Sequence, residues 1–172
     1  MNIITYPEPV LRQKAKPLTE INKKVYEKVE EMMALMYRAS GIGLAAPQVG
    51  WSVRLFIIDV TGGKYEDKVF INPTTVGEEG ELNKEEGCLS LPGITGKVIR
   101  AQKIRGHAYN LKGQKIEIEV EDLAARAWQH EMDHLNGTLF IDKVSPATRL
   151  ALSHQLKEFE RSYRDKSVKV SV

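Results

Sequence analysis

The chain has 172 residues, the length of one domain, and 42% hydrophobic with 28% charged residues predict a soluble globular protein. The net charge of +2, spread along the chain, is too small to indicate DNA or another nucleic acid as a partner. The single cysteine, Cys88, excludes an internal disulfide framework. This thiol is therefore a buried apolar group, a reactive group or a metal ligand.

The sequence carries no pattern typical of targeting or membrane insertion. Its N-terminus lacks the basic region and apolar run of a secretory signal. The longest apolar candidate, VRLFIIDV at 53–60, contains charges and is far shorter than the roughly 18 residues that a membrane span needs. We therefore expect a cytoplasmic protein with no membrane partner.

The first forty residues predict an arm followed by a helix. Three prolines within residues 6–18 predict an extended arm over the surface. Thr19 is a candidate N-cap, and Ser40 and Gly41 end the helical pattern. Between them apolar residues recur at helical spacing, and we interpret the methionines among them as core packing: Ile21, Val25, Val29, Met32, Met33 and Met36.

The middle of the chain is typical of β structure. Residues 53–60 and 68–76 have the composition of buried strands. Residues 97–109 and 114–120 alternate between polar and apolar side chains, and the sequence NLKG between them indicates a hairpin turn. The sequence therefore predicts a β-rich central region.

Two more helices are expected in the last third of the chain. The first covers about 122–136, with Gly137 as its C-terminal cap. Ser145 and Pro146 begin the second, which carries Leu152, Leu156, Phe159 and Tyr163. Residues 165–172 are polar and are expected to fray. Because the sequence shows no repeat and no linker, we expect residues 1–172 to form a single domain.

The sequence QHEMDHLNG contains an H-E-x-x-H motif on the first of these two helices. Residues four apart lie one above the other on a helix, so His130 and His134 can bind one metal ion. Glu131, turned by about 100°, lies beside the ion and can take a proton from a metal-bound water. The motif predicts a metallohydrolase site, but such a site needs a third protein ligand.

The neighbours of the motif also have expected places. Leu123 and Ala127 continue the face of the two histidines, so we expect that face to be apolar and to point inward. Gln129 and Asp133 are placed to form hydrogen bonds around the metal ligands. The helix is therefore expected to support the metal site as well as to carry it.

The third ligand distinguishes the possible classes of metalloenzyme. A metzincin-like protease needs a histidine three residues after Gly137, and Phe140 at that position excludes this class. A thermolysin-like protease needs a glutamate roughly twenty residues further on, and Glu158 is available, although its amphipathic helix favours a solvated side chain. Cys88 lies between a glycine and a proline that allow a sharp turn exposing the sulfur. An inert core cysteine is the other reading of Cys88.

Three stretches together resemble the signature motifs of peptide deformylases, in order and in spacing. They are GIGLAAPQ at 41–48, EGCLS at 86–90 and QHEMDHLNG at 129–137. The segments YPEPVLRQKA and VIR also look like this family, so the resemblance covers most of the chain. It implies the bacterial-type α+β fold, in which antiparallel sheets surround a central metal-binding helix, with an N-terminal and a C-terminal helix.

The implied activity is metal-dependent removal of the formyl group from the N-terminal formyl-methionine of newly made polypeptides, with release of formate. Carried onto matching positions, the metal ligands are Cys88, His130 and His134. Glu131 is the implied general base and acid. The formyl oxygen is bound by the side-chain amide of Gln48 and the backbone N–H of Leu89. The residues placed along the substrate channel are Gly41, Ile42 and Gly43.

The resemblance further implies one divalent ion per chain, Fe²⁺ in the cell, with Zn²⁺, Ni²⁺ or Co²⁺ as substitutes in purified protein. The implied partners are formyl-methionyl nascent peptides. A transient ribosome contact through the basic last helix is one reading of that segment, and a solvated helix face is the other. Thr95 stands where many relatives carry a larger side chain, often arginine, so the resemblance does not define the affinity for the peptide or the preference for its sequence.

Two other functions stay open from the residues themselves. One is a metallopeptidase that uses His130, His134 and Glu158 as ligands. The other is a binding protein whose metal ion is structural and fully enclosed by protein ligands, with no open coordination position. The identity of the third ligand, Glu158 or Cys88, distinguishes a metallopeptidase from a deformylase. An open coordination position at the metal distinguishes a deformylase from a protein with a structural metal ion.

Overall fold

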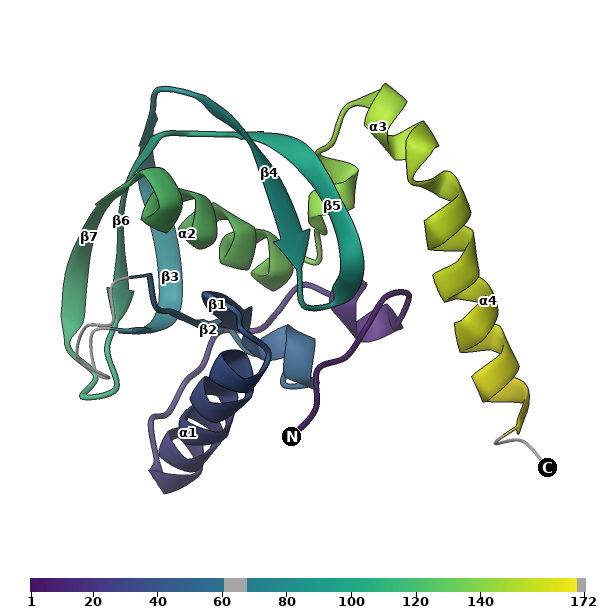
Figure 1. Ribbon diagram of the computed structural model, residues 1–172. Coiled ribbons are helices and arrows are strands. Elements are labelled where there is room, and N and C mark those ends of the chain that lie inside the picture. Colours follow the sequence, from purple (N-terminus) through teal and green to yellow (C-terminus); the bar gives the residue numbers. More distant parts are fainter. Residues whose placement is uncertain (61–67, 170–172) are drawn as a thin grey trace.

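The computed structural model describes residues 1–60 and 68–169, which adopt an α+β fold (Figure 1). Short 3₁₀ helices are denoted η. The elements in chain order are η1 (Pro9–Arg12), α1 (Lys23–Arg38), β1 (Gly43–Ala45), η2 (Ala46–Val49), β2 (Leu55–Ile58), β3 (Val69–Glu79), β4 (Leu82–Cys88), β5 (Leu91–Arg100), β6 (Lys103–Tyr109), β7 (Lys115–Glu121), α2 (Asp122–Leu135), η4 (Phe140–Asp142), α3 (Pro146–Ala151) and α4 (Ser153–Lys169).

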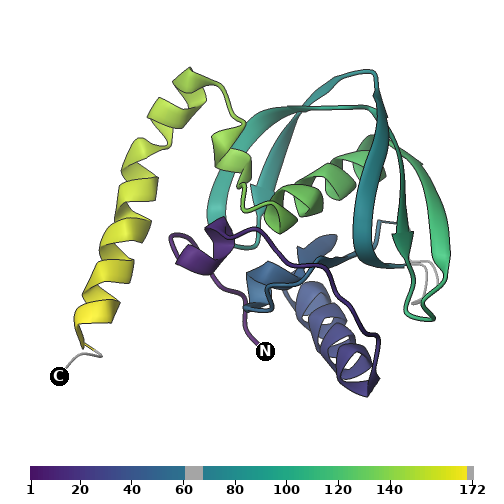
Figure 2. The same cartoon turned by 180° about the vertical axis from the view of Figure 1, so that it is seen from behind.

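Two antiparallel sheets lie around α2. Among the described residues, one sheet has five strands in the order β1-β2-β3-β6-β7, and the other is the pair β4-β5. Figures 1 and 2 show α2 enclosed by the two sheets, with α1 beside β1 and β2 and with α4 at the edge of the molecule opposite β6 and β7. The expected α+β arrangement around a central helix is therefore confirmed.

The strand β2 shows why this sequence places a helix on each face of the large sheet. All four of its residues are buried. Leu55 and Ile57 belong to the cluster that contains the apolar side of α1, whereas Phe56 and Ile58 pack with Trp128 of α2. Because successive side chains point to opposite faces, a strand covered on both sides has to be apolar throughout.

The N-terminal helix is confirmed, but its predicted cap is wrong. The helix α1 begins at Lys23, and the side chain of Asn22 accepts a hydrogen bond from the backbone N–H of Lys24 at 3.1 Å. Just before Thr19, both backbone groups of Leu18 are bound by the side chain of Asn72 at 2.8 Å. This tertiary contact fixes the backbone just before Thr19, and the helix begins only after Asn22, which supplies the cap.

The arm of residues 6–18 is less extended and more buried than the prolines predict. It contains η1, and it buries Leu11 and Ala15. The backbone N–H of Ala15 donates to the carbonyl of Leu135 at the end of α2 at 2.9 Å. The arm is therefore packed against the central helix.

The β region differs from expectation in two ways. Residues 97–109 do not form one strand, because β5 ends at Arg100 in the small sheet and β6 begins at Lys103 in the large one. The strand β4 has no signal in the sequence because four of its seven residues are exposed and it lacks an apolar alternation. The hairpin between β6 and β7 is confirmed, with Asn110 bound through its N–H to the carbonyl of Gln114 at 2.9 Å.

The C-terminal helices are confirmed with one division. The helix α2 covers Asp122–Leu135, and Gly137 follows it with a φ of +71°. The expected last helix is two helices, α3 and α4, interrupted at Leu152. The helix α4 continues to Lys169, so 165–169 are helical rather than frayed, and 170–172 lie outside the described residues. No described helix is long and apolar enough to cross a membrane.

Two glycines with left-handed backbones predict different costs of substitution. A Cβ at Gly137 would lie 2.5 Å from the carbonyl oxygen of Arg12, whereas a Cβ at Gly93, with a φ of +76°, would meet no heavy atom within 4 Å. We expect Gly137→Ala to lower the free energy of unfolding by at least about 3 kcal/mol, and Gly93→Ala by about 1 kcal/mol. Urea denaturation at equal metal loading measures both, and equal losses would contradict close packing of the arm on the end of α2.

Candidate metal centre

Three potential metal ligands from two elements meet at one point. Cys88 is the last residue of β4, and His130 and His134 lie one turn apart on α2. Their donor atoms all lie within 4.8 Å of one another, and the sulfur is 3.2 Å from Nε2 of His134. A thiolate and two imidazoles are the sulfur and nitrogen donors that Zn²⁺ and similar divalent ions prefer. The residues present therefore fit one bound metal ion.

The end of β4 is shaped to point the Cys88 side chain toward α2. The register between β4 and β5 shifts between Gly87 and Cys88, and such an irregularity re-aims a side chain. Two groups then donate to the sulfur, the backbone N–H of Ser90 at 3.4 Å and Nε2 of Gln48 at 3.5 Å. The sulfur thus has two N–H donors in addition to its contact with His134.

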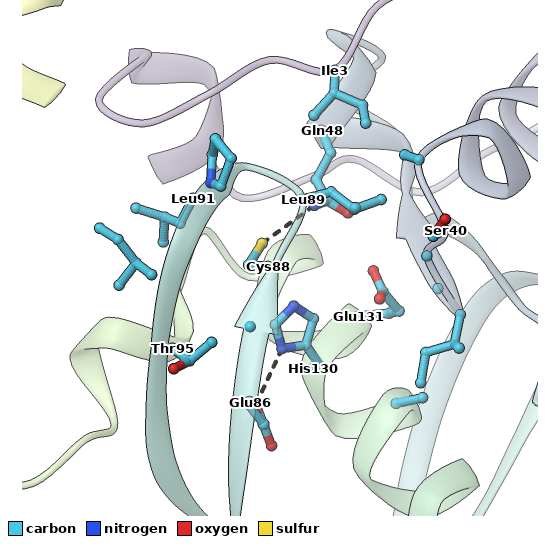
Figure 3. A pocket seen from close by; sticks show the side chains of 18 of the residues that line it. Ile3, Ser40, Gln48, Glu86, Cys88, Leu89, Leu91, Thr95, His130 and Glu131 are labelled. Carbon is cyan, nitrogen blue, oxygen red and sulfur yellow. Dashed lines mark hydrogen bonds and ion pairs between the residues drawn. The ribbon is translucent and has the colours of Figure 1, made fainter.

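A chain of charged side chains orients His130. Nδ1 of His130 lies 3.2 Å from Oε2 of Glu86, as marked in Figure 3. Arg100, only 3% exposed, donates to both carboxylate oxygens of Glu86 at 2.9 Å and to Asp133 at 2.5 Å. Lys143 lies 3.0 Å from the other oxygen of Asp133. Because Nδ1 is occupied by Glu86, the other ring nitrogen of His130 is the one left for a metal ion.

The two histidines differ in pKa because their surroundings differ. Burial lowers the pKa of His130, but hydrogen bonds to Cys88 and Glu86 outweigh it and raise the pKa to about 10. Burial, together with the charge of His130, lowers the pKa of His134 well below its usual value. His134 is therefore a neutral ligand, whereas metal binding at His130 has to displace a proton.

Glu86 stays ionised beside His130. Burial raises the pKa of Glu86, but hydrogen bonds with His130 and Arg100 outweigh it and lower the pKa to about 2. Burial likewise opposes the charge of Arg100, and its bonds to Glu86 and Asp133 more than compensate, so its pKa is raised. The negative charge of Glu86 is thus available to balance a divalent ion bound through His130.

Glu131 is a buried carboxylate with one free oxygen. It is 3% exposed, and its Oε2 has no hydrogen-bond partner among the described residues. Burial raises its pKa to about 7. Figure 3 shows its carboxylate beside His130, facing the same space as Cys88 and Gln48. A carboxyl group with such a pKa can accept and return a proton near neutral pH.

The cluster lies in a pocket of about 690 Å³ between the 39–43 segment, β4, β5 and α2. A Cβ at Gly43 would lie 2.4 Å from Oε1 of Glu131, so only glycine fits there without a shift. Gly41 and Ile42 line the same wall. Gln48 is buried at one end, where its Oε1 accepts from the N–H of Ala45 at 2.8 Å.

Some expected positions differ from the structure. Leu123 is 48% exposed because it lines the open pocket rather than an apolar core, whereas Ala127 is buried as expected. Gln129 binds the backbone of Ala101 and Ala125 rather than a group around the metal ligands. Among the described residues, Asp133 is linked to His130 through Arg100 and Glu86 rather than directly.

The glutamate needed for a thermolysin-like site lies elsewhere. The side chain of Glu158 is 67% exposed on α4 and pairs with His154. Among the described residues, the group that can hold a metal contains Cys88 and not Glu158. Phe140, which excludes a metzincin, is buried and stacks on His130 at 6.4 Å between ring centroids. The geometry therefore contradicts the hypothesis of a metallopeptidase that uses Glu158 as its third metal ligand.

The sequence patterns do not single out Glu86 or Arg100, although one signal was available for the arginine. In β5 the buried positions recur at every second residue near its end, and Arg100 falls on that buried face after Val98. A charged residue at a buried strand position requires a partner. Glu86, by contrast, lies in a run of charged residues that conceals it.

Comparisons with known proteins agree with this geometry. Residues 1–150 match the family model described as Polypeptide deformylase. The chain is 46% identical to a peptide deformylase of Acidobacterium capsulatum, covering 93% of this chain and 95% of the relative. It is 53% identical to one from Halothermothrix orenii, covering 80% and 88%. The chain belongs to the peptide deformylase family.

Solved structures of peptide deformylases share the whole fold. The crystal structure of the Plasmodium falciparum peptide deformylase aligns with a TM-score of 0.91 at 38% identity, covering 95% of this chain and 98% of that one. Deformylases are metal-dependent enzymes, and the Cys88, His130 and His134 group is the one that the described residues offer to a metal.

The link from Glu86 to His130 predicts an effect on metal affinity. Replacing Glu86 with alanine removes the acceptor that orients His130 and leaves Arg100 buried with fewer partners, so we expect divalent metal to bind about 10- to 100-fold more weakly. Glu85→Ala is the matched control, because the neighbouring carboxylate contacts Thr95 instead. Competition with a metal-sensitive dye measures both affinities. Equal affinities in the two variants would contradict the orienting role.

Proposed function

We propose that the chain removes the formyl group from the N-terminal formyl-methionine of nascent polypeptides and releases formate. The observation that carries this proposal is the free, buried carboxylate of Glu131 beside the three converging donors of Cys88, His130 and His134. Membership of the deformylase family supports the same reaction. We further propose that residues 1–172 work as a single domain.

Cys88, His130 and His134 would hold one divalent ion, with Glu86 balancing its charge through His130. When bound, the ion supplies the Lewis acidity that makes water a nucleophile near neutral pH. We assign Fe²⁺ as the metal of the cell, following the sequence resemblance, and Zn²⁺, Ni²⁺ or Co²⁺ as substitutes. The pocket beside the donors leaves room for the formyl group to approach them.

Glu131 would act as general base and then as general acid. Its Oε2 is free to accept the proton of the attacking water. The same carboxyl group then returns a proton to the amine as the bond between the formyl carbon and the peptide nitrogen breaks. Burial, which raises the pKa of Glu131, suits this double role because both forms of the carboxyl group are accessible near neutral pH.

The amide of Gln48 and the backbone N–H of Leu89 would bind the formyl oxygen. Negative charge grows on this oxygen when the formyl carbon is attacked, and fixed N–H donors stabilise it. The Gln48 side chain is prepared for this role, because Ala45 binds its oxygen and so fixes which way its Nε2 points. The cysteine next to Leu89 lies within hydrogen-bond reach of that Nε2.

The wall formed by residues 41–43 would guide the peptide. It ends in β1, which is an edge strand of the large sheet, so its outer backbone groups face away from β2. Gly43 lets the substrate come close to Glu131, since a side chain at this position would collide with the carboxylate. Ile42 and Leu123 are partly exposed at the pocket and offer apolar surface to the methionine side chain.

Glu131→Gln tests the proposed acid and base. The amide keeps the size of the side chain but cannot take a proton, so we expect metal content to stay at one ion per chain and formate release from a formyl-Met-Ala-Ser peptide to fall at least about 100-fold. Glu158→Gln, on the exposed face of α4, is the matched control and should retain full activity. Full activity of Glu131→Gln would rule out this role.

The choice of metal predicts a difference in sensitivity to oxygen. Both ferrous iron and the Cys88 thiolate can be oxidised, so we expect the iron-loaded protein to lose activity in air or peroxide, whereas the nickel-loaded protein retains most of it. Time courses of formate release after exposure measure this difference. If both forms decay at the same rate, the assignment of iron as the oxygen-labile working metal fails.

A further inference from the structure

We propose that residues 3–6, the first part of an N-terminal arm that covers residues 3–18, are a positioning element that holds the two donors of the formyl oxygen in register. This inference rests on the proposed function. It assigns a role in the reaction to a segment that lies outside the three sequence motifs. Its basis is a pair of backbone hydrogen bonds that join the arm to both donor-carrying segments.

The two donors come from segments that belong to different β-sheets. Gln48 lies in η2, directly after β1 of the five-stranded sheet. Leu89 lies in the connection between β4 and β5, the separate two-stranded sheet. Stabilising one oxygen requires both N–H groups to point at the same place to within a fraction of an ångström. Something must therefore fix the one sheet relative to the other at this point.

The arm bonds to both segments. The N–H of Ile4 donates to the backbone carbonyl of Gln48 at 2.8 Å. Two residues later, the N–H of Tyr6 donates to the backbone carbonyl of Ser90, next to Leu89, at 2.9 Å. The side chain of Ile3 lines the pocket, and Figure 3 shows it beside Gln48. The arm is therefore a two-point clip across the boundary between the sheets.

The direct bond between the two segments cannot do this alone during the reaction. Nε2 of Gln48 donates to the hydroxyl of Ser90 at 3.2 Å. Both hydrogens of this amide already have acceptors, the Ser90 hydroxyl and the Cys88 sulfur, so donation to the formyl oxygen has to replace one of these bonds. The backbone bonds of the arm use neither the amide of Gln48 nor the N–H of Leu89. They remain in place while both donors act.

The arm is itself fixed to the helix that carries the histidines. Further along it, the N–H of Ala15 donates to the carbonyl of Leu135, the residue after His134. The hydroxyl of Tyr6 donates to Glu160 of α4 at 2.5 Å, and Leu11 is buried between these points. Figure 2 lets the reader follow the arm between η2 and the end of α2. The clip thus shares a rigid frame with the metal ligands.

An amide-to-ester replacement at Ile4 tests the clip without changing any side chain. It removes the N–H that binds Gln48 and weakens the carbonyl of Ile3 as an acceptor, but the backbone bond that it breaks is the one to Gln48. We expect kcat for a formyl-Met peptide to fall about tenfold, with KM and metal content unchanged, because a displaced donor weakens the transition state more than the bound substrate. The same replacement at Gln13, whose N–H binds Val10 at the end of η1, is the matched control and should leave kcat unchanged.

The same ester replacement in a Gln48→Ala protein distinguishes a positioning role of the arm from a general structural role. If Ile4 acts through Gln48, the ester should cause no further loss of kcat in a Gln48→Ala protein, because the donor that it aligns is already absent. A full additional tenfold loss in that background would overturn the inference, and so would an unchanged kcat in the single replacement. Formate release by the unmodified chain tests the proposed function separately. Its absence would overturn both.

Discussion

The side chain of Arg100 joins the small sheet to the central helix, and the geometry of the candidate metal centre depends on it. From β5 it binds both oxygens of Glu86 on β4 and one oxygen of Asp133 on α2. Glu86 in turn holds His130. Because Cys88 follows Glu86 by two residues on the same strand, the arginine fixes the separation between the cysteine and the two histidines.

The ion pairs of Arg100 with Glu86 and Asp133 orient the metal ligands, and they contribute little to the stability of the fold. Removing charges from water costs about as much as a buried ion pair returns, so its net contribution to folding is small. Apolar packing joins β5 to the segment after α2, since Leu91, Ile94 and Val98 form a cluster with Phe140 of η4, which stacks on His130 of α2. Packing of this kind does not select which way a histidine ring turns, whereas a carboxylate on Nδ1 does. Apolar packing therefore provides the stability of this region, and the charged network sets the orientation of the metal ligands.

The sequence predicts some parts of the site and not others, for physical reasons. Helical periodicity places His130 and His134 on one face, because this relation depends only on local spacing. Gln129 and Asp133 have the right spacing as well, but their partners lie on β5 and are set by tertiary packing. The register of β4 with β5 brings Cys88 close to the H-E-x-x-H motif, and no local sequence pattern predicts this register. The assignment of Cys88 as a metal ligand came from the resemblance to the peptide deformylase family.

The same division holds for the fold. The all-apolar run of β2 and the periodic face of α1 follow from burial, and both are predicted. The strand β4, by contrast, forms by pairing with β5, a contact that no local pattern in β4 indicates. The sequence therefore fails to predict an element where a long-range contact overrides the local preference of the residues.

The most direct test of the account is X-ray absorption at the metal edge of the protein loaded with one equivalent of nickel or zinc. We expect one sulfur and two imidazole nitrogens in the first coordination shell, with the remaining position taken by a light atom from solvent. The zinc form should show a sulfur distance of about 2.3 Å and nitrogen distances of about 2.0 to 2.1 Å. A shell without sulfur would contradict Cys88 as a ligand, and with it the deformylase chemistry proposed for this site.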